Sequence, residues 1–328
     1  MIVNLVRAEV VRLAARRFVG GMLALLLGAL VITFATTVAS SHAPSQVELD
    51  QARVSMQEER ARIVQTRQEC REAQAKPIGG WPGVDCERQF DPDRVRVENF
   101  LDGVFVFAGS IRSLVLFLTA FLALFGFLVG ASFVGAELAS GGMTNLLLWR
   151  PQRLTVLGTK LGVLLAAVLA LSVVVTAGYL GVFRLLAEVG GTAGDTGGTF
   201  WPDLLWLSVR GILLAVGATA LGFVLATVGR HTAAALGALA AYAVVWELGG
   251  RIVAEMIRVS RPSLLFLGTY LAAWLDGDIR LHDTRCGFAD PCVSFYTITW
   301  VESGAVMFVA LAAALVATFA LFRRRDLT

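Results

Sequence analysis

Six apolar runs, each long enough to cross a lipid bilayer, constrain the fold of this chain more than any other feature of its sequence. Crossing the apolar core of a bilayer takes ~20 predominantly apolar residues, because each backbone polar group must find its partner within its own helix. A seventh run, residues 262–274, is too short and is expected to dip into the membrane or lie at its surface. Only 16% of the residues are charged, against about 25% in soluble domains. The sequence therefore predicts an all-α membrane protein whose six transmembrane helices cover residues 18–40, 113–136, 155–183, 204–229, 232–250 and 303–322.

The first apolar run follows Arg16 and Arg17, a pattern that a cleaved signal peptide also shows. The run is longer than the apolar region of a typical signal peptide, and no clear small-residue cleavage site is followed by a soluble mature chain. We therefore interpret residues 18–40 as the first transmembrane helix.

The positions of arginine and lysine orient these helices, because short cytoplasmic loops collect positive charge. With six crossings, one side of the membrane holds both termini, the connection between the second and third helices, and the turn between the fourth and fifth. On that side the acidic residues are only Glu9, Glu137 and Asp326. We therefore assign this side to the cytoplasm. Its eleven basic residues are Arg7, Arg12, Arg16, Arg17, Arg150, Arg153, Lys160, Arg230, Arg323, Arg324 and Arg325.

The four cysteines test this orientation without using charge, because disulfides persist in oxidising compartments. Cys70 and Cys86 fall in the first outer loop, and Cys286 and Cys292 fall in the last. The simplest pairing joins Cys70 to Cys86 and Cys286 to Cys292, although four cysteines allow three connectivities. A seven-helix arrangement would place the second pair in the reducing cytoplasm, and we therefore reject it.

The first outer loop, residues 41–112, is predicted to form a helical extracytoplasmic insert. Ser45 and Glu48 match the capping box that begins a helix, and a proline follows the polar stretch, which predicts a helix over residues 46–75. This helix carries only a thin apolar stripe, so it is expected to pack against another element.

A second helix of the insert is predicted to begin at Asp91 and Pro92, with the aspartate as its cap and the proline in its first turn. It would lead toward the second transmembrane helix. The expected disulfide between Cys70 and Cys86 would join the two helices, which favours a structural lid over a catalytic domain.

Residues 251–302 are expected to form a second extracytoplasmic region. Within it, residues 274–292 gather four aspartates and a histidine, but their spacing matches neither a calcium loop nor an established zinc pattern. We therefore predict a solvated loop closed by a disulfide, and no metal site. Where this region begins, Glu247 and Arg251 lie one helical turn apart. They belong either to an amphipathic extension, which is favoured, or to the polar mouth of a translocation path.

Residues 113–250 are expected to hold the second to fifth transmembrane helices, and the stretch ELASGGMTNLLLWRPQRLTVLGTK lies in the longest cytoplasmic connection between them. Gly142 breaks the second helix, Thr144 or Asn145 can cap a short helix, and Pro151 ends it.

This short helix would lie parallel to the membrane and present Trp149 and Arg150 to the cytosol. Arg153 and Lys160 are then expected to anchor the third transmembrane helix at the lipid surface.

This connection resembles the coupling loop of type 2 ABC exporter permeases, in which an acidic residue, a Gly-Thr pair, a Leu-Leu run, Pro-x-Arg and a lysine occur in that order. Met143 stands where the family usually has threonine. Residues 1–17 are similar to the family's interfacial elbow helix, and the FRRRDL motif in residues 303–328 resembles its usual C-terminus. The matching positions in the loop are Glu137, Gly142, Leu146, Leu147, Pro151, Arg153 and Lys160.

The resemblance implies the membrane permease subunit of an ATP-driven exporter in a bacterial plasma (inner) membrane, with both termini in the cytoplasm. In such permeases the coupling loop, here residues 137–154, docks on a separate cytoplasmic ATPase whose closure moves the membrane helices. The alternative is that the loop is only a positively charged anchor. The resemblance assigns ATPase coupling to Glu137, Gly142, Trp149, Arg150, Pro151 and Arg153.

The chain contains no G-x-x-x-x-G-K-[ST] phosphate loop, so we expect no enzyme and no cofactor in this chain; ATP and Mg²⁺ would be bound by the partner ATPase. Its three histidines are scattered, which predicts neither a metal site nor a hydrolytic triad. The expected partners are the ATPase, a second permease copy or paralogue, and membrane lipid, with no nucleic acid.

Small residues at helical spacing permit the close helix packing that a dimer of permeases needs. Gly126 and Gly130 supply them in the second helix, and Ala233, Gly237 and Ala241 in the fifth. This spacing is common in membrane helices, so it supports packing and locates a dimer interface only weakly.

Phe117, Phe121 and Phe125 form an aromatic stripe in the second helix. With Glu247 and Arg251 they are the candidate lining of a substrate path for a hydrophobic or amphipathic cargo, and the alternative for the stripe is contact with lipid or neighbouring helices.

Two other functions compete with that of the exporter subunit. One is a non-transporting membrane anchor or sensor whose outer insert binds a partner. The other is a secondary transporter, which is disfavoured because no charged relay or interrupted helix is evident at mid-span. Drug, lipid, peptide and glycan exporters share all of these features, so the sequence leaves the substrate open.

Overall fold

The computed structural model describes residues 2–75, 85–142, 152–257, 259–282 and 295–324. Its internal contacts divide the chain into two compact units. The first unit consists of Met1–Leu30, Arg112–Gly178 and Trp201–Thr328, and the second of Val31–Ile111 and Tyr179–Phe200.

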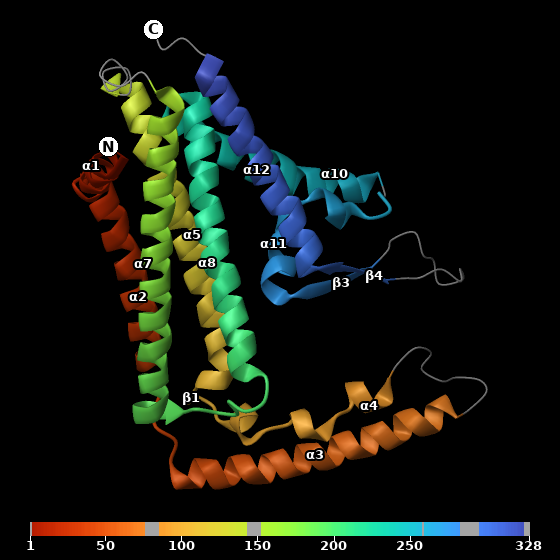
Figure 1. The fold of residues 1–328 in the computed structure, drawn as a ribbon. Helices are drawn as coiled ribbons and strands as arrows, with labels where there is room; N and C mark the ends of the chain where they lie inside the picture. Colours follow the sequence, from red (N-terminus) through yellow and green to blue (C-terminus); the bar gives the residue numbers. More distant parts are fainter. Residues whose placement is uncertain (1, 76–84, 143–151, 258, 283–294, 325–328) are drawn as a thin grey trace. The chain divides into compact units, whose positions relative to one another are not determined.

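The described residues contain six helical runs long and apolar enough to cross a membrane, as the sequence predicts. This confirms an all-α membrane fold. The second and third runs are longer than expected, because apolar residues continue the helical pattern beyond the predicted limits. The runs are α2 (Arg17–Ala39), α5 (Phe107–Ala139), α7 (Arg153–Gly190), α8 (Phe200–Gly229), the composite run Thr232–Met256, and α12 (Trp300–Arg324) (Figure 1).

In the first unit, α5 and α8 pack closely because glycines face the other helix. A Cβ atom at Gly130 would lie 2.3 Å from the backbone oxygen of Thr219, and one at Gly222 would lie 2.3 Å from the oxygen of Phe127. Gly126 faces Thr219 in the same way. The small residues predicted in the second helix therefore serve packing within the chain.

The fifth run is not the single regular helix that the sequence suggests. It consists of α9 (Thr232–Ala241), the π-helical segment η3 (Tyr242–Gly249) and α10 (Gly250–Met256). A π-helical segment widens the helix and changes its direction. Figure 1 shows α10 at a steep angle to α12. The run nevertheless stays one continuous helical span, Thr232–Met256, with the π-helical segment inside it.

The short apolar run that follows forms η4 (Pro262–Leu265) and α11 (Leu267–Asp276). α11 packs against α12, where the rings of Trp274 and Phe308 lie 5.4 Å apart. Beyond it, β3 (Asp278–His282) pairs in antiparallel register with β4 (Phe295–Thr299). The sequence predicts only a loop here, because the two strands are short and separated by a polar stretch.

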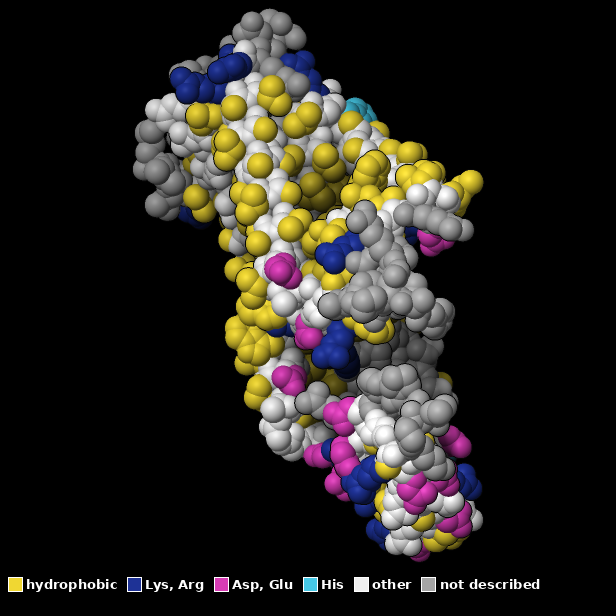
Figure 2. Space-filling model, turned by 90° about the vertical axis from the view of Figure 1, so that its right-hand side faces the viewer, with side chains coloured by type: hydrophobic (Ala, Val, Ile, Leu, Met, Phe, Trp, Pro, Cys, Tyr) yellow, Lys and Arg dark blue, Asp and Glu magenta, His cyan; other side chains and the backbone are white. Residues whose placement is uncertain are grey.

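The N-terminal helix α1 (Ile2–Ala14) precedes α2, and the chain turns between them at Ala15 and Arg16. Lys and Arg side chains gather at the upper end of Figure 2, and hydrophobic side chains cover the apolar helices next to it. Basic residues therefore collect at the end of the first unit that holds the ends of α1 and α12 (Figure 1).

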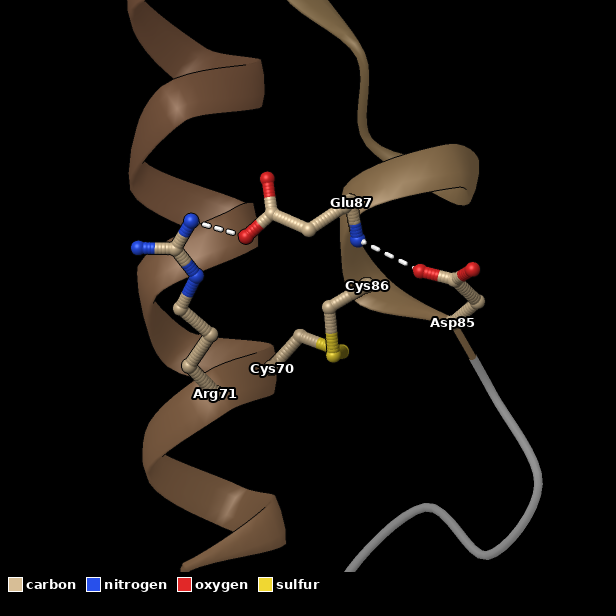
Figure 3. Close-up of a disulfide and its surroundings, with 5 residues drawn as sticks. All are labelled: Cys70, Arg71, Asp85, Cys86 and Glu87. Atoms are coloured by element: carbon tan, nitrogen blue, oxygen red, sulfur yellow. Dashed lines mark hydrogen bonds and ion pairs between the residues drawn. A yellow bond between two sulfur atoms is a disulfide. The ribbon is translucent and has the colours of Figure 1, made fainter.

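In the second unit, α3 (Gln46–Gln74) begins at the predicted capping box. The Ser45 backbone N–H donates to Glu48 Oε2 at 2.7 Å, and the Glu48 N–H donates to the Ser45 hydroxyl at 3.3 Å. The disulfide joins Cys70 in α3 to Cys86 at the start of α4 (Cys86–Gln89), as Figure 3 shows.

The second predicted helix of the insert is instead two short 3₁₀ turns, η1 (Pro92–Arg94) and η2 (Val97–Phe100). Asp91 does cap the first turn, since its Oδ1 accepts from the Asp93 N–H at 3.0 Å. The chain becomes extended at Val95, whose oxygen accepts a hydrogen bond from Arg60 Nε of α3 at 3.0 Å. This contact with α3 replaces the hydrogen bonds that a longer helix would make.

A parallel pair of very short strands completes the second unit: β1 (Phe105–Val106) lies beside β2 (Gly191–Thr192). The rings of Phe105 and Tyr179 lie 5.7 and 4.7 Å from that of Phe183, which is fully buried. Aromatic side chains thus form part of the core of this unit.

Candidate functional site

The ends of α5 and α7 that border residues 143–151 lie in the first unit, together with α1. Four charged side chains meet there: Glu9 of α1, Arg16 of the turn after α1, Glu137 of α5 and Lys160 of α7. We refer to them as the buried charge cluster.

Lys160 is the centre of the buried charge cluster. Its side chain is fully buried, and its Nζ lies 2.6 Å from Glu9 Oε2 and 2.7 Å from Glu137 Oε2. The Glu9 side chain is also fully buried. The ammonium group lies 4.9 Å from the centre of the Phe133 ring, in a position that favours a cation–π interaction.

Two arginines complete the pairing of the carboxylates. Arg16 Nη2 lies 2.5 Å from Glu137 Oε1, and its Nη1 donates to the backbone oxygen of Ser132 at 3.0 Å. The Arg12 side chain is half exposed, and its Nη1 lies 2.9 Å from Glu9 Oε1. Each carboxylate therefore has two cationic partners.

Close pairing allows these charges to be buried. Transferring charges out of water is costly, and close pairing with hydrogen bonds offsets that cost. Losing one partner leaves a buried charge uncompensated. The buried charge cluster therefore holds α1 in a fixed position against the end of α5 and the start of α7.

The structure corrects the role that the sequence suggests for Lys160. Its side chain does not reach the lipid surface, because it is fully buried and its ammonium group pairs with Glu9 and Glu137. Sequence reasoning also missed Glu9. The available signal was that Glu9 is the single acidic residue among the basic residues of α1.

A family model described as "ABC-2 family transporter protein" matches residues 5–327 of the chain. The chain belongs to this family. The match includes most of α1 with Glu9 as well as the basic end of α12, and the described part of the chain holds six candidate membrane spans. No curated protein and no solved structure matches the chain. The protein is thus a membrane component of an ABC-2 transporter, a subunit that normally lacks an ATPase site of its own and associates with an ABC ATPase.

The predicted coupling residues of this ABC-2 transporter lie on both sides of the undescribed segment. Glu137 belongs to the buried charge cluster, and the exposed Gly142 follows Gly141, whose positive φ of 72° ends α5. Arg153 is the first residue of α7. The remaining three, Trp149, Arg150 and Pro151, lie outside the described residues, as does the short helix expected there.

The predicted aromatic stripe of the ABC-2 chain does not line the apolar cavity formed by α5, α8, α9, α11 and α12. The ring of Phe117, which is partly exposed, lies 4.5 Å from that of Phe121, and Phe125 is buried. The cavity has a volume of about 510 Å³, and α5 contributes Ala123, Leu124 and Phe127 to it. A role of the stripe in the substrate path stays a prediction.

Glu247 of the π-helical segment η3 and Arg251 of α10 form a hydrogen-bonded network. Arg251 Nη2 lies 2.5 Å from Glu247 Oε1, and the Tyr242 hydroxyl donates to Glu247 Oε2 at 3.0 Å. The backbone N–H of Gly268, in α11, donates to the same carboxylate at 3.2 Å. The network therefore joins η3 to α11. This pairing occurs inside the fifth candidate span, and the predicted role in a translocation path stays a prediction.

The cysteines of the outer loops are described in part. The Cα atoms of Cys70 and Cys86 lie 5.9 Å apart. Next to the disulfide, Glu87 forms ion pairs with Arg67 and with Arg71, of which Figure 3 shows the pair with Arg71. The other two cysteines, Cys286 and Cys292, lie outside the described residues, so their pairing stays a prediction. Within the described residues, no group of three or more His, Cys, Asp or Glu side chains is arranged to hold a metal ion.

Proposed function

We propose that the chain is the permease subunit of an ATP-driven exporter, driven by a separate cytoplasmic ATPase that binds ATP and Mg²⁺. Membership of the ABC-2 family supports this function over that of a non-transporting anchor or sensor. The absence of a phosphate loop from the sequence is in keeping with a motor on another polypeptide. The chain lies in a bacterial plasma (inner) membrane with both termini in the cytoplasm, in agreement with the basic end formed by α1 and α12.

The observation that carries the coupling mechanism is the buried charge cluster. The coupling loop connects α5 to α7, and Glu137 and Lys160 lie in these two helices on either side of it. Because Lys160 pairs with both Glu137 and Glu9, a force applied to the loop moves α5, α7 and α1 together. Without the pairs, the ends of the two helices would move independently and the force would be lost in the loop.

The first test concerns docking of the ATPase. Arg150→Glu combined with Pro151→Ala places a negative charge in the loop and removes its proline, so association with the co-purified ATPase and ATPase activity are both expected to fall. Arg17→Glu is the control, because Arg17 is an exposed arginine near the same end of the first unit. If association and activity both stay unchanged in the loop variant, the coupling function is wrong.

The second test separates docking from force transmission. Glu137→Gln removes the shared carboxylate of Arg16 and Lys160 while leaving residues 143–151 intact. We expect the ATPase to remain bound, and transport to fall relative to ATP hydrolysis. Loss of ATPase association in this variant would assign Glu137 to the docking surface instead.

A permease of this class works as a pair, with a second copy or a paralogue. On α9, Ala233, Gly237 and Ala241 are exposed and small, and a Cβ atom at Gly237 would meet nothing within 4 Å. Such a face permits close contact with another helix. Gly237→Cys is therefore expected to form a cross-linked dimer under oxidation. Gly162→Cys is the control, because this glycine of α7 is equally exposed and open.

A further inference from the structure

The apolar cavity of about 510 Å³ lies among α5, α8, α9, α11 and α12 of the first unit. Its volume is within the range of about 300–1,000 Å³ that small-molecule sites occupy. All residues that line it are apolar, including Leu214, Gly217, Trp274 and Leu311. An apolar cavity offers water no hydrogen-bonding partners, so water does not fill it. The aliphatic chains of a surrounding bilayer do match this lining.

An arginine lies next to the cavity at one end. Trp274 lines the cavity, and its Nε1 donates to the backbone oxygen of Arg210 at 3.0 Å. The Arg210 guanidinium lies 4.9 Å from the centre of the Trp300 ring, which is itself 6.2 Å from that of Trp274. The Arg210 guanidinium therefore packs on Trp300, whose ring is the neighbour of the Trp274 ring that lines the cavity.

The guanidinium of Arg210 lacks an anionic partner among the described residues. Its Nε is buried without a hydrogen-bond acceptor, and no ion pair joins it to a described carboxylate. The neighbouring Arg112, in contrast, pairs with Asp276 at 2.6 Å. An incoming anion would satisfy the buried donor, whose unpaired state is costly.

The depth of Arg210 in the helix suits a lipid headgroup. Arg210 and Arg230 are separated by 20 residues of sequence that run along α8 and just past its end. At a rise of 1.5 Å per residue this is roughly 30 Å, about the thickness of the apolar core of a bilayer. The two arginines are thus placed near opposite interfaces, and Arg210 lies at the interface opposite the basic end of the first unit.

We propose that this cavity holds one acyl chain of an anionic glycerophospholipid of the bilayer, with the headgroup phosphate bound at Arg210. The acyl chain lies against Trp274 and Gly217, and the headgroup accepts hydrogen bonds from the guanidinium. The lipid is a resident ligand of the membrane domain. The site does not depend on ATPase coupling or on the identity of the cargo.

Tryptophan quenching tests the site in the full chain, reconstituted in nanodiscs of phosphatidylcholine that contain a small share of one phospholipid with brominated acyl chains. Brominated phosphatidylglycerol and brominated phosphatidylcholine are compared at equal mole fractions. The chain has seven tryptophans, so the contribution of Trp274 is taken as the difference between the wild type and Trp274→Phe. We expect brominated phosphatidylglycerol to reach half-maximal quenching at a mole fraction roughly fivefold lower than brominated phosphatidylcholine. This factor corresponds to about 1 kcal/mol for one arginine at an anionic headgroup.

Three variants separate the headgroup contact from the cavity. Arg210→Gln is expected to abolish the preference for phosphatidylglycerol. Arg280→Gln is the matched control, because Arg280 is exposed on β3 and the same charge is removed, so the preference should persist. Gly217→Leu is expected to weaken quenching by both lipids, since a Cβ atom there meets neighbours only at 3.7 Å or more and the added side chain fills the cavity.

A second experiment tests the proposal with the wild-type chain alone. Native mass spectrometry of the chain extracted from an equimolar mixture of the two lipids should show phosphatidylglycerol retained in excess. Equal retention of both lipids, no Trp274-dependent quenching, or a preference that survives in Arg210→Gln would each overturn the proposal.

Discussion

Lys160 Nζ lies 2.6 Å from Glu9 Oε2, although the two residues are 151 positions apart in the chain and both side chains are fully buried. This pair joins the N-terminal helix to the start of α7. Together with Glu137, it determines how the ends of the membrane helices are held next to the coupling loop.

Replacing Lys160 by methionine is expected to destabilise the protein by about 3–5 kcal/mol, because the change leaves a buried carboxylate without its closest cation. Denaturant unfolding in detergent measures this loss. Arg17→Gln is the control, since it removes an exposed charge near the same end and should change stability by about 0.5 kcal/mol or less. Equal stability of the two variants would contradict a structural role for the buried charge cluster.

The pair is also expected to be energetically coupled. Glu9→Gln alone leaves Lys160 with Glu137, and Lys160→Met alone leaves Glu9 with the half-exposed Arg12. The double variant should lose less stability than the sum of the two single variants, by about 0.5–3 kcal/mol. Strict additivity in this double-mutant cycle would show that the contact between Glu9 and Lys160 makes no net contribution to stability.

Two identical substitutions should have opposite effects on stability. Gly130→Ala places a Cβ atom 2.3 Å from the backbone oxygen of Thr219 and should cost about 1–3 kcal/mol, because the two helices must move apart. Gly162→Ala meets nothing within 4 Å and should stabilise α7 by up to about 1 kcal/mol. Thermal unfolding in the same detergent compares the two. A stabilising Gly130→Ala would mean that α5 and α8 are not in close contact.

Removing the disulfide by Cys70→Ser with Cys86→Ser is expected to destabilise the outer insert by about 3 kcal/mol, the chain-entropy value for residues 16 positions apart. Hydrogen exchange should become faster in α3 and α4 and stay unchanged in α8. Peptide mapping without reduction checks the pairing itself and also tests whether Cys286 is joined to Cys292. Unchanged exchange in α3 would show that the ion pairs of Glu87 suffice.

The capping box of α3 should respond to pH through Glu48. The backbone N–H of Ser45, and after it the Ser45 hydroxyl, hold the pKa of Glu48 below its ordinary value. The stabilisation is therefore fully present above the ordinary glutamate pKa and is lost as the pH falls through the lowered pKa of the folded state. Hydrogen exchange in the first turn of α3 should increase in this acidic range. Glu48→Gln should remove the dependence on pH.

The apolar runs by themselves determined the number of membrane helices, because a bilayer leaves no other way to satisfy the backbone of a long apolar segment. Local signals were equally reliable where the partners are close in sequence: the capping box of Ser45 and Glu48, the cap at Asp91, and the pairing of Cys70 with Cys86 all lie within 16 residues. The order of residues in the connection between α5 and α7 predicts a coupling loop by resemblance, and this assignment stays a prediction.

Only the tertiary structure decided which distant residues meet. Glu9 and Lys160 are on different helices, and nothing in either local pattern shows that the lysine points inward rather than toward lipid. The same holds for the pairing of β3 with β4, and for the bend at η3, where Glu247 reaches the N–H of Gly268 in α11. Sequence periodicity reports the face of a single element, whereas pairing energies depend on what a second element places opposite that face.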